Sequence, residues 1–187
     1  MPTNLNLLAF FNFFETKEER NLYYKQERRN IMLANIERVI EQYSDMVYRI
    51  ALTRTGTKEN AEDIYQDVFL KYSQKAKEFE SFSHEKAWLI KVTINMTKNF
   101  NNSSWNKKVV NLDENIKFET PEETGVYEVV CRLPQNYRTV IYLMYYEGYK
   151  INEISEMMKV KEGTIKTWAF RARELLKKDL EGGFENE

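Results

Sequence analysis

The sequence contains few of the residues on which disulfides, metal sites and tight turns depend. Its 187 residues include one cysteine, one histidine, six glycines and three prolines. Cys131 therefore cannot form an internal disulfide, and together with His84 it cannot complete a Cys/His zinc site, so we expect neither a metal nor a cofactor. A single cysteine fits a reducing compartment, and we expect the protein to act in the cytoplasm.

Signatures of several enzyme classes are missing as well. Neither GxGxxG nor GxxxxGK[ST] occurs in the chain, which argues against a nucleotide-binding α/β enzyme. The sequence offers no pair of a nucleophile and a base, and no pair of carboxylates, that would indicate a catalytic centre. Because glycine and proline are scarce, a turn-rich β-sandwich is also disfavoured. We therefore do not expect an enzyme.

Long hydrophobic runs are absent from the sequence. Residues 7–14 read LLAFFNFF, about half the length of a membrane-spanning helix, which takes ~20 residues. No basic residue precedes this run, so it is a poor signal peptide. The codons for Glu27, Arg28 and Arg29 can contain a ribosome-binding sequence two codons before Met32. We hypothesise that residues 1–31 are translated leader, and the alternative is a genuine helical extension.

Charge divides the rest of the chain into three parts. Lys and Arg number 12 against 10 Asp and Glu in residues 32–108, 1 against 5 in residues 109–125, and 10 against 10 in residues 126–187. The acidic segment 109–125 also contains Pro121 and Gly125 and is expected to be a flexible linker between two domains. The net charge of −1 lacks the basic footprint of a lone DNA-binding module, so any nucleic-acid binding would need local patches or a partner.

Apolar residues recur at three- and four-residue steps on both sides of the linker, which indicates helices. The predicted helices cover residues 33–54, 58–76, 84–101, 126–132, 137–146, 151–158 and 162–180. Gly56 is expected to end the first helix, and Thr57 and Ser83 to cap the next two. The segment 137–146 has the β-branched content of a buried strand, but its neighbours are helical. The fold class is therefore all-α, with two small helical bundles joined by the linker.

The last two predicted helices form a helix-turn-helix pattern. Residues 151–158 make the first helix, residues 159–163 the turn, and Ile165, Ala169, Ala172 and Leu176 the buried face of the second helix. In this motif the N-terminal part of the second helix enters the major groove of DNA. The residues able to reach bases or phosphates are Lys161, Glu162, Thr164, Lys166, Thr167, Trp168 and Arg171. The alternative is a helical hairpin with a solvated, charged face.

Three stretches resemble one known family. LPQNYRTVIYLMYYEGYKINEISEMMKVKEGTIKTWAFRARELLKK (133–178) resembles region 4 of bacterial sigma factors of the extracytoplasmic-function (ECF) group. AEDIYQDVFLKYSQK (61–75) and AWLIKVTINMTKNF (87–100) resemble region 2 of the same family. The resemblance implies a dissociable, non-catalytic subunit of RNA polymerase that confers promoter recognition. It also implies core polymerase (its β′ and β subunits), promoter DNA and an anti-sigma factor as partners, without a small-molecule substrate.

The resemblance implies roles for particular residues. Asp63, Gln66 and Asp67 would contact a coiled coil of the polymerase β′ subunit. The non-template strand of the −10 element would meet Phe79, Ser81, Phe82, His84, Lys91, Asn95 and Lys98, the last three on an exposed helix face. Trp88 is expected to pack in the core. The helix-turn-helix would read the −35 element.

Two departures from the family pattern limit what can be transferred. Thr167 and Trp168 stand where the family has Ser-Arg, and residues 101–104 (NNSS) stand where it often has Arg-Arg. The promoter sequence is therefore not transferable. A second hypothesis is a stand-alone helix-turn-helix regulator that binds duplex DNA as a dimer without polymerase. Such a regulator does not require the helix that carries Asp63.

Overall fold

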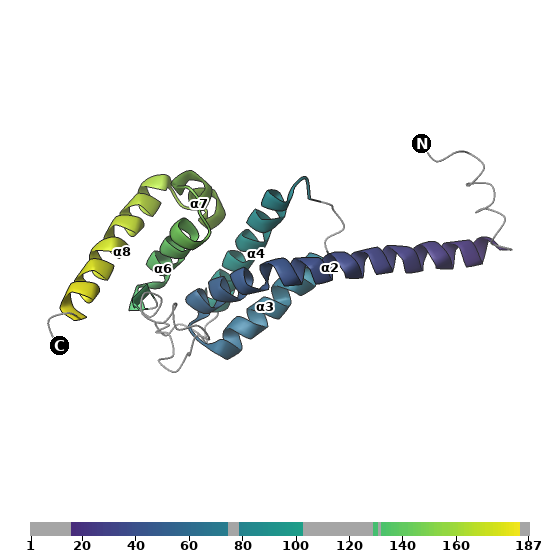
Figure 1. Ribbon diagram of the computed structural model, residues 1–187, viewed down its shortest axis with the longest axis horizontal. Coiled ribbons are helices and arrows are strands. Elements are labelled where there is room, and N and C mark those ends of the chain that lie inside the picture. The colour runs from purple at the N-terminus through teal and green to yellow at the C-terminus, as the bar shows by residue number, and fades with distance from the viewer. Residues whose placement is uncertain (1–15, 75–78, 103–128, 131, 184–187) are drawn as a thin grey trace. The chain divides into compact units, whose positions relative to one another are not determined.

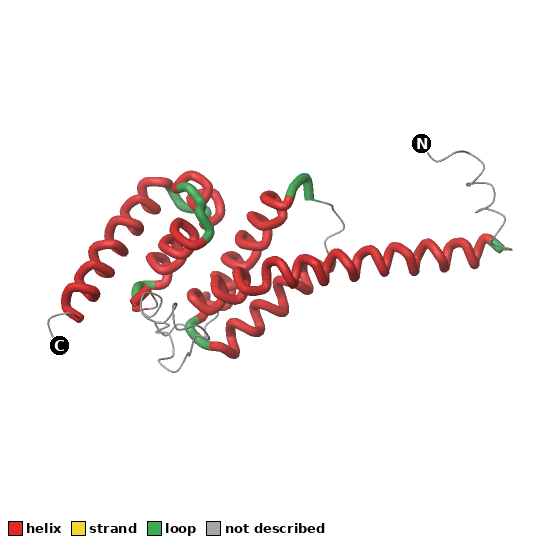
Figure 2. The backbone as a smooth tube through the Cα atoms, in the orientation of Figure 1, coloured by secondary structure: helices red, strands yellow, loops and turns green. Residues whose placement is uncertain are grey.

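The computed structural model describes residues 16–74, 79–102, 129–130 and 132–183. Within these ranges it contains helices joined by short loops and no strand (Figure 2). The helices, labelled in Figure 1 where there is room, are α2 (Lys17–Thr55), α3 (Lys58–Ser73), α4 (Phe82–Asn102), α6 (Gln135–Ile141), the π-helix η1 (Tyr142–Tyr146), α7 (Ile151–Met158) and α8 (Glu162–Gly183). The all-α prediction is confirmed. The predicted linker 109–125 lies outside the described residues.

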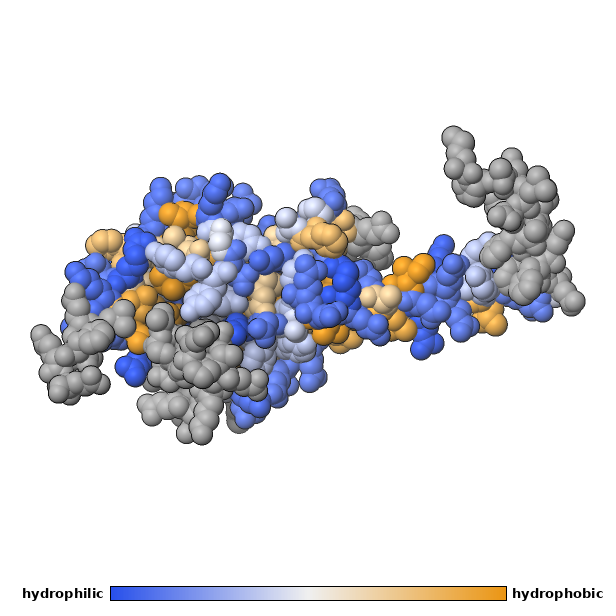
Figure 3. Space-filling view, viewed as in Figure 1, coloured by the Kyte–Doolittle hydropathy of each residue, from blue (hydrophilic) through white to orange (hydrophobic). Residues whose placement is uncertain are grey.

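The chain divides into two compact units, Met1–Gln42 and Tyr43–Glu187. In the first unit, α2 begins 16 residues before the predicted start at 33, so that start was wrong. A capping box causes the early start, because the Thr16 hydroxyl accepts from the Glu19 N–H at 3.1 Å and the Glu19 carboxylate accepts from the Thr16 N–H at 3.0 Å. Apolar side chains reach the surface of this part of α2 (Figure 3), among them Leu22, 66% exposed, and Ile31, 64% exposed.

The second unit begins with the end of α2, followed by α3 and α4. Gly56 ends α2 in the left-handed region at φ +81°, and the Thr57 side chain caps α3 by accepting from the Asn60 N–H, both as predicted. The three helices bury a shared set of apolar side chains. These include Val47, Ile50, Ala51, Ala61, Ile64, Val68, Leu89, Ile90 and Ile94.

The predicted cap of α4 was wrong. The helix begins at Phe82, and the hydroxyl of Ser81 accepts from the His84 N–H at 3.2 Å. The Ser81 carbonyl accepts from the Glu85 N–H at 3.0 Å, which is the first bond of the helix. Ser83 is therefore already inside the first turn. Two serines two residues apart offer equivalent caps by sequence, and the helix takes the earlier one.

The remaining helices follow the predicted order. Residues 137–146 are helical, as expected, and their last turn widens into η1 before Gly148 ends it at φ +73°. The bounds of α7 match the prediction, and α8 extends three residues beyond its predicted end. Of the helix predicted over 126–132, residues 129, 130 and 132 are described, and all three are helical.

Helix α8 packs against α6 and α7 through the predicted apolar face. Ile165, Ala169 and Ala172 are buried and Leu176 is half-buried, which confirms that prediction. Helix α7, the first helix of the helix-turn-helix, also packs against α4 within the second unit. No helix among the described residues is long and apolar enough to cross a membrane.

Candidate nucleic-acid and polymerase interface

The turn of the helix-turn-helix is fixed by backbone bonds. Lys159, in the left-handed region at φ +56°, ends α7, and its N–H and that of Val160 both reach the Ser155 carbonyl. The Val160 bond is the 6→1 bond of a Schellman motif, and the Lys159 bond is the 5→1 bond of the αL motif. The Thr164 N–H then bonds to the Lys161 carbonyl at 2.9 Å and starts α8. Three residues therefore separate α7 from α8, and most residues of the first turns of α8 are exposed.

The predicted −35 residues lie just before α8 and on the side of α8 that faces away from its buried residues. Five of them are exposed and two, Thr164 and Trp168, are half-buried. The exposed ones are Lys161, Glu162, Lys166, Thr167 and Arg171. The Thr167 hydroxyl donates to the Gly163 carbonyl at 2.9 Å, so its oxygen could serve a further partner only as an acceptor. Hydroxyl, guanidinium and ammonium groups at this position suit both base edges and phosphates.

Helix α3 presents an acidic face opposite its buried one. Asp63, Gln66 and Asp67 are all exposed and lie within one helical turn of each other. Ile64 and Val68, which directly follow the two aspartates in the sequence, are buried on the opposite face. The three polar side chains thus form a contiguous surface whose charge is complementary to a basic partner.

The predicted −10 residues fall into two groups, and the first lies at the start of α4. Ser81, Phe82 and His84 are exposed, Phe82 by 65%. Phe79 is half-buried, because its ring stacks on Tyr72 at 5.8 Å and meets Trp88 edge-on at 5.6 Å. Phe79 therefore packs against both α3 and α4. This aromatic cluster was not predicted. Trp88 was expected to pack in the core, and it is half-buried against Tyr72 and Phe79.

The second group lies along α4 and was expected to be exposed, which was wrong. Lys91, Asn95 and Lys98 are half-buried. The Lys98 ammonium donates to the Met158 carbonyl at 2.6 Å, because the end of α7 lies there. Burial, followed by the charges of Arg54 and Lys159, lowers the pKa of Lys98.

A buried arginine near this face was missed by sequence reasoning. Arg54 donates through Nε to the Thr97 hydroxyl at 2.7 Å and through Nη1 to the Thr139 hydroxyl at 3.0 Å. Each threonine hydroxyl donates in turn to a carbonyl of its own helix. Burial, and then the charge of Arg138, lower the pKa of Arg54 to about 10. The available signal was that Arg54 continues the apolar stripe of Val47, Ile50 and Ala51.

Comparison with known proteins decides the family. Residues 39–106 match the family described as Sigma-70 region 2, and residues 125–176 match Sigma-70, region 4. The chain belongs to the sigma-70 family. Its relatives assign it to the ECF group: it is 25% identical to the ECF RNA polymerase sigma factor SigW of Bacillus subtilis over 162 residues, 76% of this chain and 87% of that protein. It is 28% identical to SigM of the same organism over 167 residues, 81% of this chain and 99% of that protein.

The fold agrees with that of a solved sigma factor. The structure of RpoE in complex with the anti-sigma factor NepR from Bartonella quintana aligns with a TM-score of 0.62 at 20% identity, covering 79% of this chain and 97% of that one. This sigma factor is thus a polymerase-associated, DNA-binding protein of transcription initiation, and sigma factors as a family are not enzymes. Because both regions occur in one chain, a stand-alone regulator is less supported.

Proposed function

We propose that this ECF sigma factor binds core polymerase through Asp63, Gln66 and Asp67, opens the −10 element with region 2 and reads the −35 element with region 4. The observation that carries the proposal is the presence of three separate polar faces, on α3, α4 and α8, within two regions that match the family in the family's order. Each face has the chemistry that its role needs. The α3 face is acidic, and the α8 face carries basic and hydroxyl groups.

The proposed −10 role rests on the predicted −10 residues, which lie at the start of α4 and along its length. Melting a duplex costs stacking energy, so a site that holds an unstacked base and neutralises phosphates favours the melted state. The exposed Phe82 ring and His84 offer stacking surfaces. Asn95 offers both hydrogen-bond donors and an acceptor, and Lys91 and Lys98 supply positive charge.

Regulation is proposed to come from an anti-sigma protein in the cytoplasm. The solved relative RpoE was determined with the anti-sigma factor NepR, and the same class of partner would cover the polar faces of regions 2 and 4 here. Co-purification from the native host, followed by inhibition of transcription by the captured protein, tests this part.

Run-off transcription tests the function itself. Purified core polymerase is given fragmented genomic DNA with or without this protein, and the 5′ ends of the transcripts are sequenced. We expect new start sites that share one −35 and one −10 sequence. If the protein instead shifts duplex fragments without core polymerase and yields no new transcripts, the stand-alone regulator is correct.

A further inference from the structure

A buried carboxylate lies in the first turn of α4, among the predicted −10 residues. Glu85 is 3% exposed, and Tyr72, one residue before the end of α3, is 5% exposed. The Tyr72 hydroxyl donates to Glu85 Oε1 at 2.6 Å. This distance is typical of a hydroxyl bound to a carboxylate, which is stronger than a bond between neutral groups. The pair therefore joins the end of α3 to the start of α4.

Tyr72 also carries the ring of Phe79. The two rings are stacked, with 5.8 Å between their centres and 5° between their planes. The Phe79 ring in turn meets the His84 ring edge-on at 5.8 Å. Trp88 closes the cluster, because it lies edge-on to Tyr72 at 6.0 Å and to Phe79 at 5.6 Å. The orientation of the Tyr72 ring therefore determines where Phe79 lies, and Phe79 contacts the exposed His84.

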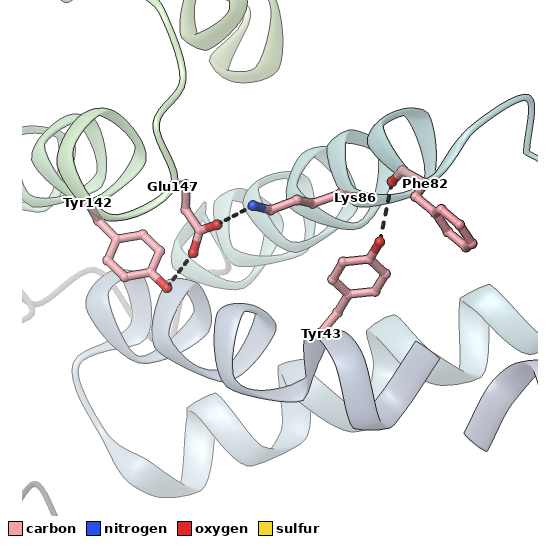
Figure 4. A network of polar contacts seen from close by, with 5 residues as sticks. All are labelled: Tyr43, Phe82, Lys86, Tyr142 and Glu147. Atoms are coloured by element: carbon pink, nitrogen blue, oxygen red, sulfur yellow. Dashed lines mark hydrogen bonds and ion pairs between the residues drawn. The ribbon is translucent and has the colours of Figure 1, made fainter. Parts of the chain in front are cut away.

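A second tyrosine holds the same turn of α4 from α2. The Tyr43 hydroxyl donates to the Phe82 carbonyl at 3.3 Å (Figure 4). Tyr43 is 5% exposed, whereas Phe82 is 65% exposed. The backbone of Phe82 is thus fixed while its ring remains accessible to a partner. Hydrogen bonds from α2 and from α3 together set the position of the first turn of α4.

The buried Tyr72–Glu85 pair is a poor means of adding stability to this core. A buried carboxylate loses its hydration, and a buried charged group is often no more stabilising than apolar side chains of the same size. One helical turn away, Val68 on α3 and Leu89 on α4 are fully buried and apolar. A hydrogen bond is directional, which an apolar contact is not. The pair therefore suits a requirement for one defined ring orientation.

We propose that Glu85 and Tyr72 are positioning residues of the −10 site. Their hydrogen bond sets the Tyr72 ring and the stacked Phe79 ring, and the cluster presents His84 and Phe82 to the unstacked −10 strand. Glu85 and Tyr72 do not touch DNA themselves, because both are buried. The consequence for promoter opening rests on the proposed function, and the positioning within the free protein does not.

Paired substitutions separate geometry from stability. Tyr72→Phe combined with Glu85→Met makes both partners apolar at similar size, which can be neutral or stabilising. We expect this double variant to keep its helicity and to unfold at a urea concentration no lower than the unsubstituted protein. Glu85→Gln keeps a side-chain oxygen that accepts from the Tyr72 hydroxyl, so it should preserve the geometry. If the double variant does not fold, Tyr72→Phe alone replaces it in each measurement.

The matched control makes the same two substitutions elsewhere in region 2. It is Tyr48→Phe combined with Glu59→Met, because Tyr48 is half-buried on α2 and Glu59 is exposed in the first turn of α3. Neither residue contacts the Tyr72 cluster in the printed ring contacts of Tyr48, which are with Tyr65. The control should therefore behave as the unsubstituted protein in both experiments below.

Nuclear magnetic resonance of the free, full-length protein tests the positioning. Nuclear Overhauser contacts between the ring protons of Phe79 and His84 should be present in the unsubstituted protein, in Glu85→Gln and in the control. They should be lost in the double variant, because the Tyr72 ring is no longer held. Contacts that persist in the folded double variant would overturn the inference. Their absence from the unsubstituted protein would overturn it as well.

Promoter opening tests the consequence. Polymerase holoenzyme is bound to a promoter mapped by the run-off experiment, and permanganate reactivity of the −10 thymines measures opening. Since apparent affinity scales with the fraction of competent protein, the double variant should need about tenfold more holoenzyme for half-maximal opening. Glu85→Gln should match the unsubstituted protein, and all variants should bind a −35 duplex equally.

The outcomes distinguish the two levels of the inference. Equal opening by the double variant and the unsubstituted protein would overturn the role of the pair in promoter opening. An equal defect in the control would show that the effect is not specific to Tyr72 and Glu85. Absence of new transcripts with the unsubstituted protein would instead refute the proposed function, and the Overhauser contacts would still decide the positioning.

Discussion

At the residue scale, Phe79 and Phe82 show how neighbouring aromatic residues of one predicted site differ. Phe79 packs on Tyr72 and Trp88, whereas Phe82 is 65% exposed. We expect Phe79→Ala to lower the free energy of unfolding by about 2 kcal/mol, less than for a fully buried phenylalanine. The matched control Phe82→Ala should cost less than about 0.5 kcal/mol. Urea unfolding followed by circular dichroism measures both. Equal losses would contradict the packing role of Phe79.

Helix α8, the second helix of the helix-turn-helix, gives a second prediction for single residues. Arg171 is exposed on the face of α8 shared by Thr164, Thr167 and Trp168, whereas Lys178 is exposed about two turns further along. Arg171→Ala should weaken binding to a −35 duplex by ~1–3 kcal/mol, roughly ten- to a hundred-fold, and Lys178→Ala should change it little.

Salt dependence then separates the kinds of contact that Arg171 makes. A lost phosphate contact weakens all promoter variants alike and lowers the salt slope by about one. If the lost contact is to a base, the loss of affinity is confined to variants that differ at one position of the −35 element. Titration of the purified polymerase holoenzyme against duplex variants at several salt concentrations measures both. Equal effects of the Arg171 and Lys178 substitutions would show that the recognition face is misplaced.

At the scale of the element, the start of α4 can be tested directly. The Ser81 hydroxyl caps the helix, and Ser83 lies in its first turn. Ser81→Ala should therefore lower the free energy of unfolding by about 1 kcal/mol, and Ser83→Ala should change it by much less. Thermal or urea unfolding distinguishes them. A larger loss for Ser83→Ala would reinstate the cap predicted from the sequence.

The acidic face of α3 supports a prediction about polymerase. Because Asp63 and Asp67 are exposed on one face, reversing both charges should leave the fold intact and repel a basic partner. Asp63→Arg combined with Asp67→Arg should abolish co-purification with core polymerase at unchanged helicity. The control is Asp45→Arg on α2, which changes charge on a different helix. Retained binding by the double variant would remove the α3 face from the proposed interface.

Elements with a strong apolar period were predictable, and elements started by local polar bonds were not. The bounds of α7 follow from Ile151, Ile154 and Met158, which recur at helical spacing before the turn. The early start of α2 has no apolar stripe, and only the Thr16–Glu19 capping box indicated it. In the candidate site, the outward face of α8 was predictable for the same reason as α7. The half-burial of Lys98 was not, because it depends on a contact between residues 60 positions apart.

At the scale of the whole molecule, the two ends of the first unit differ in what they bury. Among residues 17–31, Arg20 is half-buried and all the others are exposed, whereas Val39 is fully buried. A chain that begins at Met32, as the leader hypothesis requires, should therefore unfold with a free energy within about 0.5 kcal/mol of the full chain. It should also support the same run-off transcripts.

A chain that begins at Tyr43 is the control, because it also lacks Val39. Removing this fully buried side chain should cost at least about 1.5 kcal/mol, since apolar burial of this size is worth ~1.5–3 kcal/mol. Urea unfolding of the full chain and of the chains that begin at Met32 and Tyr43 ranks their free energies of unfolding. Run-off transcription with core polymerase measures their activity. If the chain from Met32 is as stable as the full chain but gives no transcripts, the exposed apolar side chains around Leu22 and Ile31 contribute to function. The leader hypothesis would then be wrong.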